Sequence, residues 1–172
     1  MQIETPRLIL RPWREEDAET LYKYAGDPRV GTPAGWPPHK SVEESREIIR
    51  TVFSAPEVYA VVLKETQEPV GCCGIIPGGV HSSRIQADEG ELGYWIAVPY
   101  WGQGLIPEAV NALINHGFKD LGLRALWIGH YDDNAKSHRV AEKCGFTYSH
   151  TESDSESGKK EHFMILRNNE ER

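Results

Sequence analysis

The sequence predicts an α+β fold. Two strand-like segments, 58–63 and 69–76, are separated by a short polar turn, which is typical of an antiparallel hairpin. Helical periodicity is clearest over 106–118, where the apolar residues fall on one stripe of a helix. A chain of 172 residues is long enough to bury one substantial core, so we expect a single domain over residues 1–172.

The N-terminal part begins with a strand pattern at 3–11 and a helical pattern at 14–24. The segment 26–40 is rich in Gly and Pro and carries Trp36, so it predicts a long loop. Ser41 then starts a second helix through the capping-box pattern Ser41-Val-Glu-Glu44. The expected buried side of this helix consists of Ile48, Ile49, Val52 and Phe53.

In the middle of the chain, a polar loop at 78–88 leads into a strand at 89–98. The next helix begins near Ile106, and His116 falls on its polar side, where we expect it to be solvated. Its apolar stripe consists of Ile106, Ala109, Val110, Leu113, Ile114, Gly117 and Phe118.

The C-terminal part predicts a strand at 125–131 and a short helix at 135–143 that a glycine stops. A final hairpin pairs 146–151 with 161–166. The polar linker 152–158 should form the surface turn of that hairpin, and the tail from Asn168 should fray.

Composition limits the possible partners and the compartment. The formal net charge of −7 disfavours general binding to nucleic acid and favours a cationic partner such as an amine. The apolar runs are short and the N-terminus lacks a signal-peptide pattern, so we expect a cytoplasmic protein that binds no membrane. Cys72, Cys73 and Cys144 show no disulfide or metal spacing and should pack as small apolar residues.

The segment from Glu89 to Glu108 carries the strongest functional pattern, a strand followed by a glycine-rich turn and a helix. Glycines 102 and 104 allow φ > 0 and a close approach of the backbone to a ligand. Free backbone N–H groups at a helix N-terminus form an anion site, although the same pattern also serves ordinary strand–turn–helix connections. The residues that follow exclude a P-loop and a dinucleotide fingerprint.

A second segment, Asn134 to Phe146, directly follows the strand at 125–131. The Asn134 amide both donates and accepts hydrogen bonds, and the Ser137 hydroxyl can pass on a proton. Taken alone, Asn134 or Ser137 is better explained as a cap of the following helix.

Together these segments resemble the GNAT acyl-CoA N-acyltransferases. Within that family they look like the RimJ/RimL-like branch, which includes ribosomal-protein N-terminal acetyltransferases. The resemblance covers nearly the whole chain and keeps the family's order. The segments that carry it are Thr5-Pro-Arg-Leu-Ile-Leu-Arg-Pro12, Glu91-Leu-Gly-Tyr-Trp-Ile96, Tyr100-Trp-Gly-Gln-Gly104, Glu108-Ala109, Asn134-Ala-Lys-Ser137 and Glu142-Lys-Cys-Gly-Phe146.

The resemblance implies the GNAT fold, a mixed and mostly antiparallel central sheet flanked by helices, with a splayed central strand pair that binds acetyl-CoA. Backbone groups of Ile96, Ala97 and Val98 would bond the pantetheine arm as an added strand does. Asn134 would contact that arm, and Ser137 would lie near the thioester sulfur. The N–H groups expected to hold the pyrophosphate are those of Trp101, Gly102, Gln103, Gly104, Leu105 and Ile106.

Two residues of the turn depart from the wider family. Trp101 stands where Gln or Arg is usual, although this branch often carries an aromatic residue there. Ile106 stands where Gly or Ala is usual, and a β-branched residue resists φ > 0 and narrows the approach to the helix.

The reaction implied by the resemblance is direct transfer of acetyl from acetyl-CoA to a primary amine, on a protein or peptide N-terminus or on a small molecule. The amine must be neutral to attack, and Glu91 is the candidate base, directly or through water. A solvated or structurally paired glutamate is the alternative for this residue. Ser137 is the candidate acid for the departing thiolate, with Tyr131 and Tyr148 as rival donors.

On the acceptor side, Trp36, Glu91 and Tyr94 are the expected contacts, and Trp36 is also explained as a core contact. The seven histidines show no metal-binding spacing, so no metal is expected. His81 lies in the 78–88 loop, which is either an ordinary surface loop or a border of the acceptor site.

Two other functions fit the sequence. A module that binds CoA without catalysis would keep the fold and lose the chemistry. A nucleotide or phosphate site unrelated to CoA would share only the glycine-rich turn. A homodimer is common in the branch, but no residue pattern here decides the oligomeric state.

Overall fold

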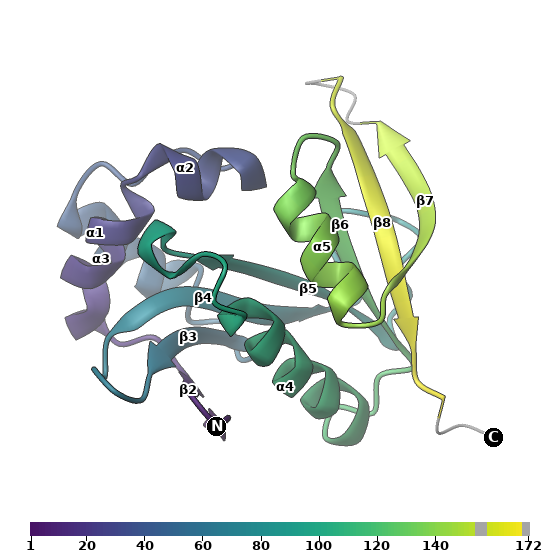
Figure 1. The fold of residues 1–172 in the computed structure, drawn as a ribbon, viewed down its shortest axis with the longest axis horizontal. Coiled ribbons are helices and arrows are strands. Elements are labelled where there is room, and N and C mark those ends of the chain that lie inside the picture. The colour runs from purple at the N-terminus through teal and green to yellow at the C-terminus, as the bar shows by residue number, and fades with distance from the viewer. Residues whose placement is uncertain (154–157, 170–172) are drawn as a thin grey trace. The chain divides into compact units, whose positions relative to one another are not determined.

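The computed structural model describes residues 1–153 and 158–169 (Figure 1). Its strands are β1 (Ile3–Glu4), β2 (Leu8–Arg11), β3 (Val58–Leu63), β4 (Pro69–Pro77), β5 (Glu89–Ile96), β6 (Ala125–Tyr131), β7 (Thr147–Ser153) and β8 (Lys160–Arg167). Its α-helices are α1 (Ala18–Ala25), α2 (Pro28–Gly31), α3 (Val42–Thr51), α4 (Leu105–Lys119) and α5 (Ala135–Lys143). Short 3-10 turns cover Glu15–Asp17, Thr32–Ala34 and Val98–Tyr100.

The strands form one sheet in the order β1-β2-β3-β4-β5-β6-β8-β7. The pairs β1–β2, β2–β3, β3–β4, β6–β8 and β7–β8 are antiparallel, whereas β5 and β6 are parallel. The predicted α+β fold with a mixed, mostly antiparallel sheet and flanking helices is therefore confirmed.

By its internal contacts the chain divides into two units. One comprises Met1–Gly74 with Tyr94–Ala112, and the other comprises Ile75–Gly93 with Leu113–Arg172. The first unit holds β1 to β3 and α1 to α3, and the second holds β6 to β8 and α5. The elements β4, β5 and α4 contribute residues to both units.

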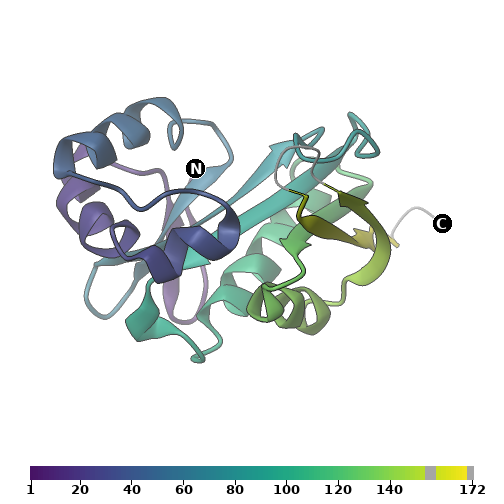
Figure 2. The same ribbon diagram turned by 90° about the horizontal axis from the view of Figure 1, so that it is seen from above.

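In the first unit, α1, α2 and α3 lie together in both views (Figures 1 and 2). Trp13 stacks on Phe53 with ring centroids 5.2 Å apart, at the edge of the core that these helices share with β3 and β4. The buried members of that core are Trp13, Ala18, Leu21, Ala25, Ile49, Ala60, Val62 and Cys72. Beside it, the guanidinium of Arg11 forms two hydrogen bonds of 2.8 and 2.9 Å with the buried carboxylate of Asp17.

The prediction of one strand over 3–11 was wrong, because the chain turns back within it. β1 and β2 pair antiparallel, with Ile3 opposite Leu10. Thr5 closes the turn: its backbone N–H donates to the Leu8 carbonyl at 3.0 Å, and its hydroxyl accepts from the Leu8 N–H at 3.0 Å. Pro6 lies within this turn, where its missing N–H leaves no ladder bond unmade.

The prediction of an uninterrupted loop over 26–40 was also wrong, because the segment contains α2 and a 3-10 turn. Asp27 caps α2 by accepting a hydrogen bond from the Arg29 N–H at 2.9 Å, and Pro28 occupies the first helical position. The Trp36 ring covers Gly31 so closely that a Cβ there would lie 2.3 Å from it.

The expected cap of α3 is present, since the Ser41 hydroxyl accepts from the Glu44 N–H at 3.0 Å. The Glu44 carboxylate accepts from the Lys40 N–H, so the reciprocal bond reaches one residue further back than a capping box requires. Val52 was wrongly assigned to the buried side: α3 ends at Thr51, and Val52 is 58% exposed.

In the second unit, β6 and α5 have the predicted bounds, and Gly145 ends the segment with φ of 87°. β8 lies between β6 and β7, as Figure 1 shows in green and yellow. The buried residues between these strands and the loop before β5 are Ile85, Ala125, Trp127, Phe163 and Ile165. Residues 154–157 of the predicted surface turn and residues 170–172 of the predicted frayed tail lie outside the described residues.

The prediction that His116 is solvated was wrong, since this side chain is only 5% exposed. Its Nδ1 lies 2.8 Å from the Asp120 carboxylate, one helical turn further on. All three cysteines are buried and free, as predicted. Among the residues described, no helix has the length and apolar character needed to cross a membrane.

We predict that Gly31→Ala destabilises the protein by about 1–3 kcal/mol, because the added Cβ would force the Trp36 ring out of its place. Urea unfolding measures this difference. Gly93→Ala is the matched control, since a Cβ at Gly93 meets no atom within 4 Å. Equal stability of Gly31→Ala and the natural protein would show that the Trp36 ring shifts at no cost.

Candidate active site

The turn before α4 has the backbone conformation that its glycines predict. Gly102 has φ of 73° and Gly104 has φ of 74°, both in the left-handed region that side chains resist. A Cβ at Gly102 would meet no atom within 4 Å, so the backbone surface is open there. α4 begins at Leu105, and its first N–H groups have no partner within the helix. The turn therefore has the form of an anion site.

Ile106 does not need the conformation that its β-branched side chain resists. Among the described non-glycine residues, the positive φ angle belongs to Gln67, and Ile106 lies within α4. Its side chain is buried, with 6% exposure. Two glycines supply the left-handed positions, so Ile106 serves as a core residue behind the turn.

The turn is held from one side by Glu108, a role that sequence reasoning missed. One Glu108 oxygen accepts from the Thr5 hydroxyl at 2.6 Å and from the Arg7 N–H at 2.9 Å, and the other accepts from Arg7 Nε at 2.7 Å. Arg7 Nη1 also donates to the Gln103 carbonyl at 2.9 Å. Partial burial alone would raise the pKa of Glu108, but these bonds outweigh it and lower the pKa. The β1–β2 turn is thereby fixed to the turn before α4.

The end of β5 already uses several backbone groups that were expected to bond a ligand. The Trp101 indole N–H donates to the Ile96 carbonyl at 2.9 Å, and the Ala97 N–H donates to the Val70 carbonyl at 2.8 Å. The carbonyls of Ala97 and Val98 accept from the N–H groups of Tyr100 and Trp101. The aromatic residue at 101 thus braces the strand end, and fewer groups there remain for an added strand than the sequence suggested.

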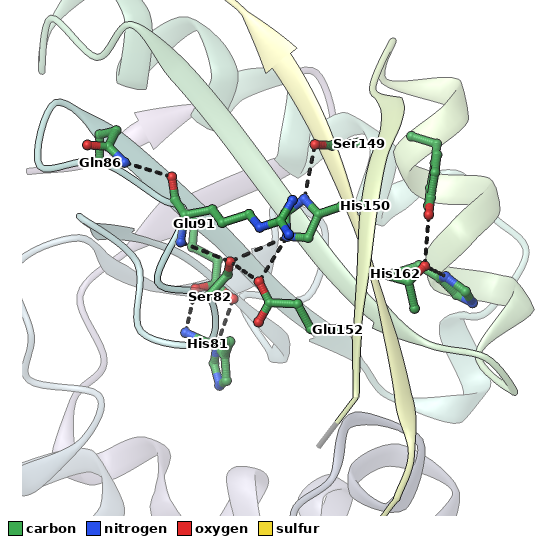
Figure 3. Close-up of polar contacts among 11 residues, drawn as sticks. His81, Ser82, Gln86, Glu91, Ser149, His150, Glu152 and His162 are labelled. Carbon is green, nitrogen blue, oxygen red and sulfur yellow. Dashed lines mark hydrogen bonds and ion pairs between the residues drawn. The ribbon is translucent and has the colours of Figure 1, made fainter. Parts of the chain in front are cut away.

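In the second unit, Glu91 is a buried carboxylate, with 5% exposure. Its Oε2 accepts from the N–H groups of Val80 and His81 at 3.0 and 3.2 Å, and its Oε1 lies 2.6 Å from His81 Nδ1 (Figure 3). Burial opposes the charged form, but these bonds outweigh it and lower the pKa of Glu91. The same contact raises the pKa of His81. Glu91 reaches its surroundings through His81, whose side chain is 56% exposed.

The loop that carries His81 has a second anchor beside it. The Ser82 hydroxyl donates to the Glu152 carboxylate at 2.6 Å, and His150 Nε2 lies 3.0 Å from the same oxygen (Figure 3). Ser82 and His150 are buried. This arrangement is not a catalytic triad, because serine and carboxylate meet the same imidazole nitrogen rather than opposite ones.

The parallel ladder of β5 and β6 ends at the level of Glu91. Its first register pair is Glu89 opposite Ala125, and its last is Glu91 opposite Trp127. Within the described second unit the ladder does not extend to Leu92, although both strands continue. Asn134 follows β6 and caps α5, with its side-chain oxygen accepting from the Ser137 N–H at 3.2 Å. The capping interpretation of Asn134 is confirmed, and Ser137 lies in the first turn of α5, partly buried.

Comparison with known proteins identifies the family. Residues 7–147 match the model of the acetyltransferase (GNAT) domain. The chain belongs to the GNAT acetyltransferases. It is 30% identical over 149 residues to the uncharacterized N-acetyltransferase p20 of Bacillus licheniformis, covering 83% of this chain and 80% of p20.

Two further comparisons bear on the branch and the fold. The ribosomal-protein-serine acetyltransferase of Escherichia coli (strain K12) is 41% identical over 56 residues, which cover 33% of this chain and 31% of that enzyme. The crystal structure of the Microcin C7 self immunity acetyltransferase MccE in complex with acetyl-CoA and AMP superposes with a TM-score of 0.76 at 20% identity, over 95% of this chain and 94% of MccE. The predicted GNAT family is confirmed, and relatives named as N-acetyltransferases and as a ribosomal-protein acetyltransferase support the predicted enzyme class and branch.

The other predicted site residues of this GNAT acetyltransferase have structural contacts. Trp36 packs against the core of the first unit, with its ring 6.0 Å from that of Trp95. Tyr94 lies on β5, partly buried. Tyr148 is 61% exposed and its hydroxyl contacts Thr151 at 2.9 Å. Their roles toward an acceptor or a thiolate stay predictions, as do those of Glu91 and Ser137.

Among the described residues, no group of three or more His, Cys, Asp or Glu side chains could hold a metal ion. The perturbed groups of the site are carboxylate and imidazole, which transfer protons.

We predict that Glu108→Gln lowers stability at neutral pH by about 1–2 kcal/mol, because the charged bonds to Thr5 and Arg7 weaken. The folded-state pKa of Glu108 lies below its usual 4.5, so this stabilisation is complete above that value and is lost as the pH falls through the folded pKa. Thermal unfolding of both proteins from pH 7 to pH 3 should show the difference shrinking. Glu65→Gln, at an exposed turn, is the control, and a difference independent of pH would contradict the assignment.

Proposed function

We propose that this chain transfers the acetyl group of acetyl-CoA directly to a primary amine, on a protein or peptide N-terminus or on a small molecule. The turn from Trp101 to Gly104 carries the proposal, because its two left-handed glycines present the start of α4 as an anion site in a GNAT chain. In this reading one catalytic domain spans the chain.

The residues around the turn fit the pyrophosphate of acetyl-CoA. A Cβ on Gly104 would lie 3.6 Å from Arg7 Nη2, so a guanidinium stands beside the open backbone. Arg7 is half-exposed, and a guanidinium is the side-chain group best suited to a phosphate. Acetyl-CoA supplies an acyl group activated as a thioester, and the chain's part is to bind it, orient the amine and move protons.

Of the two acceptor classes, we propose that a peptide N-terminus is preferred over a small amine. The support is the similarity to an enzyme named for a ribosomal protein, together with a net charge of −7 that attracts a cationic terminus. A panel of peptides with different first residues and of small amines, incubated with protein and acetyl-CoA, tests this by the release of free CoA. Binding of acetyl-CoA without turnover of any acceptor would instead support a non-catalytic module.

We predict that Gly104→Val weakens acetyl-CoA binding by at least about 10-fold, because a branched residue cannot keep φ of 74° and crowds Arg7. Calorimetry measures the dissociation constant. Gly122→Val is the matched control: Gly122 has φ of 66° and open space around it, so the strain is similar while the turn before α4 is untouched. Equal losses of affinity in both variants would remove the turn as the phosphate site.

We predict that Ser137→Ala lowers kcat by about 10-fold while acetyl-CoA affinity is kept, because Ser137 is the proposed donor to the departing thiolate. Tyr131→Phe and Tyr148→Phe measure the rival donors in the same assay. A larger loss in either tyrosine variant than in Ser137→Ala would transfer the role to that tyrosine.

A further inference from the structure

The contact between Glu91 and His81 has the geometry of an oriented base. Glu91 Oε1 meets His81 Nδ1 at 2.6 Å, so the opposite ring nitrogen, Nε2, faces away from the carboxylate. Nε2 has no hydrogen-bond partner among the described residues. The Glu91 side chain is 6% exposed and that of His81 is 56% exposed, so the pair has a buried end and an open end.

The backbone at His81 is fixed independently of its ring. The N–H groups of Val80 and His81 already donate to Glu91 Oε2, and Ser82 is tied to Glu152. A loop held in this way does not need an ionisable side chain at position 81 to stay in place. The imidazole adds the partner of the other Glu91 oxygen and leaves its second ring nitrogen for a further contact.

The pair also lies at the point where the sheet ladder stops. Glu91 opposes Trp127 in the last register pair that the described second unit shows between β5 and β6. If this protein acetylates amines as proposed above, the thioester is expected beside this part of β5. The exposed imidazole at the open end of the pair is then able to meet an amine acceptor.

We propose that His81 removes the proton from the acceptor ammonium, and that Glu91 is the residue that positions it. The N–H bond of the ammonium breaks, its electron pair stays on nitrogen, and the proton bonds to His81 Nε2. Glu91 holds the other ring N–H and stabilises the imidazolium that forms. The exposed ring then releases the proton to water.

The charged groups around His81 set the expected pH dependence. Glu91 from β5 and, more weakly, Glu161 from β8 raise the pKa of His81, while burial opposes them. A base must be neutral to accept a proton, so kcat/KM should rise as the pH rises through the pKa of His81. Replacing Glu91 by Gln removes the main cause of the raised His81 pKa. The rise of kcat/KM should therefore move to lower pH.

The deciding experiment compares His81→Asn, Glu91→Gln and their double variant with the natural protein, using acetyl-CoA and an active peptide or amine. An Asn amide can still donate to Glu91, so the loop contact is kept and only the base is lost. We expect kcat/KM to fall about 100-fold in His81→Asn, with acetyl-CoA affinity unchanged. The double variant should be no slower than His81→Asn, because the two residues act as one unit.

Two further measurements separate catalysis from structure. Imidazole added to His81→Ala should restore part of the rate, and Ser83→Ala, at an exposed position of the same loop, should keep the full rate. An unchanged rate in His81→Asn alongside a large loss in Glu91→Gln would make Glu91 the base and overturn the proposal. Unchanged rates in both, or no rescue by imidazole, would overturn it too. A natural protein that turns over no amine would refute the proposed function itself.

Discussion

A carboxylate buried within a strand needs hydrogen-bond donors, and the buried Glu91 on β5 must find them in the segments around it. An unpaired buried carboxylate would cost several kcal/mol, a large share of the roughly 5–15 kcal/mol by which folded domains are stable. The strand itself cannot supply the donors, since its N–H groups point along the sheet. The loop before β5 therefore bends back, and the N–H groups of Val80 and His81 reach the carboxylate. The exposed position of the His81 ring follows from satisfying that one buried charge.

The turn before α4 solves the opposite problem, since its donors must stay available. Gly102 and Gly104 have left-handed angles, the space beside Gly102 is open, and a helix start supplies N–H groups without partners in the helix. Such a turn has few contacts of its own to hold it. Glu108 supplies these contacts by accepting hydrogen bonds from Thr5 and Arg7. Arg7 also donates to the Gln103 carbonyl of the turn. The acceptors of this region are thus satisfied within the protein while donors at the helix start are left for a ligand.

The sequence predicted correctly several features that depend on interactions between residues close in the chain. The bounds of β6 and α5, the left-handed glycines and the Ser41 cap depend on periodicity and turn chemistry within a few residues. Two errors were local, the turn closed by Thr5 and the helix α2 capped by Asp27, whereas other errors depend on what packs against a residue. His116 lies on the polar side of its helix, but burial depends on what covers that side. The same limit applies to the site: the glycine-rich turn could be found from the sequence, whereas the contact of Glu108 with Arg7 joins residues about a hundred positions apart.

The pairing of a buried carboxylate with an exposed imidazole sets a balance between base strength and availability. Glu91 raises the pKa of His81, which makes the imidazole a stronger base and at the same time lowers the neutral fraction at a given pH. A free histidine would have more neutral base but no fixed tautomer, and either ring nitrogen could face the amine. The contact at 2.6 Å assigns Nδ1 to the carboxylate and so reserves Nε2 for the acceptor. Glu91 thus governs proton transfer through the orientation of another residue, although its own oxygens are occupied.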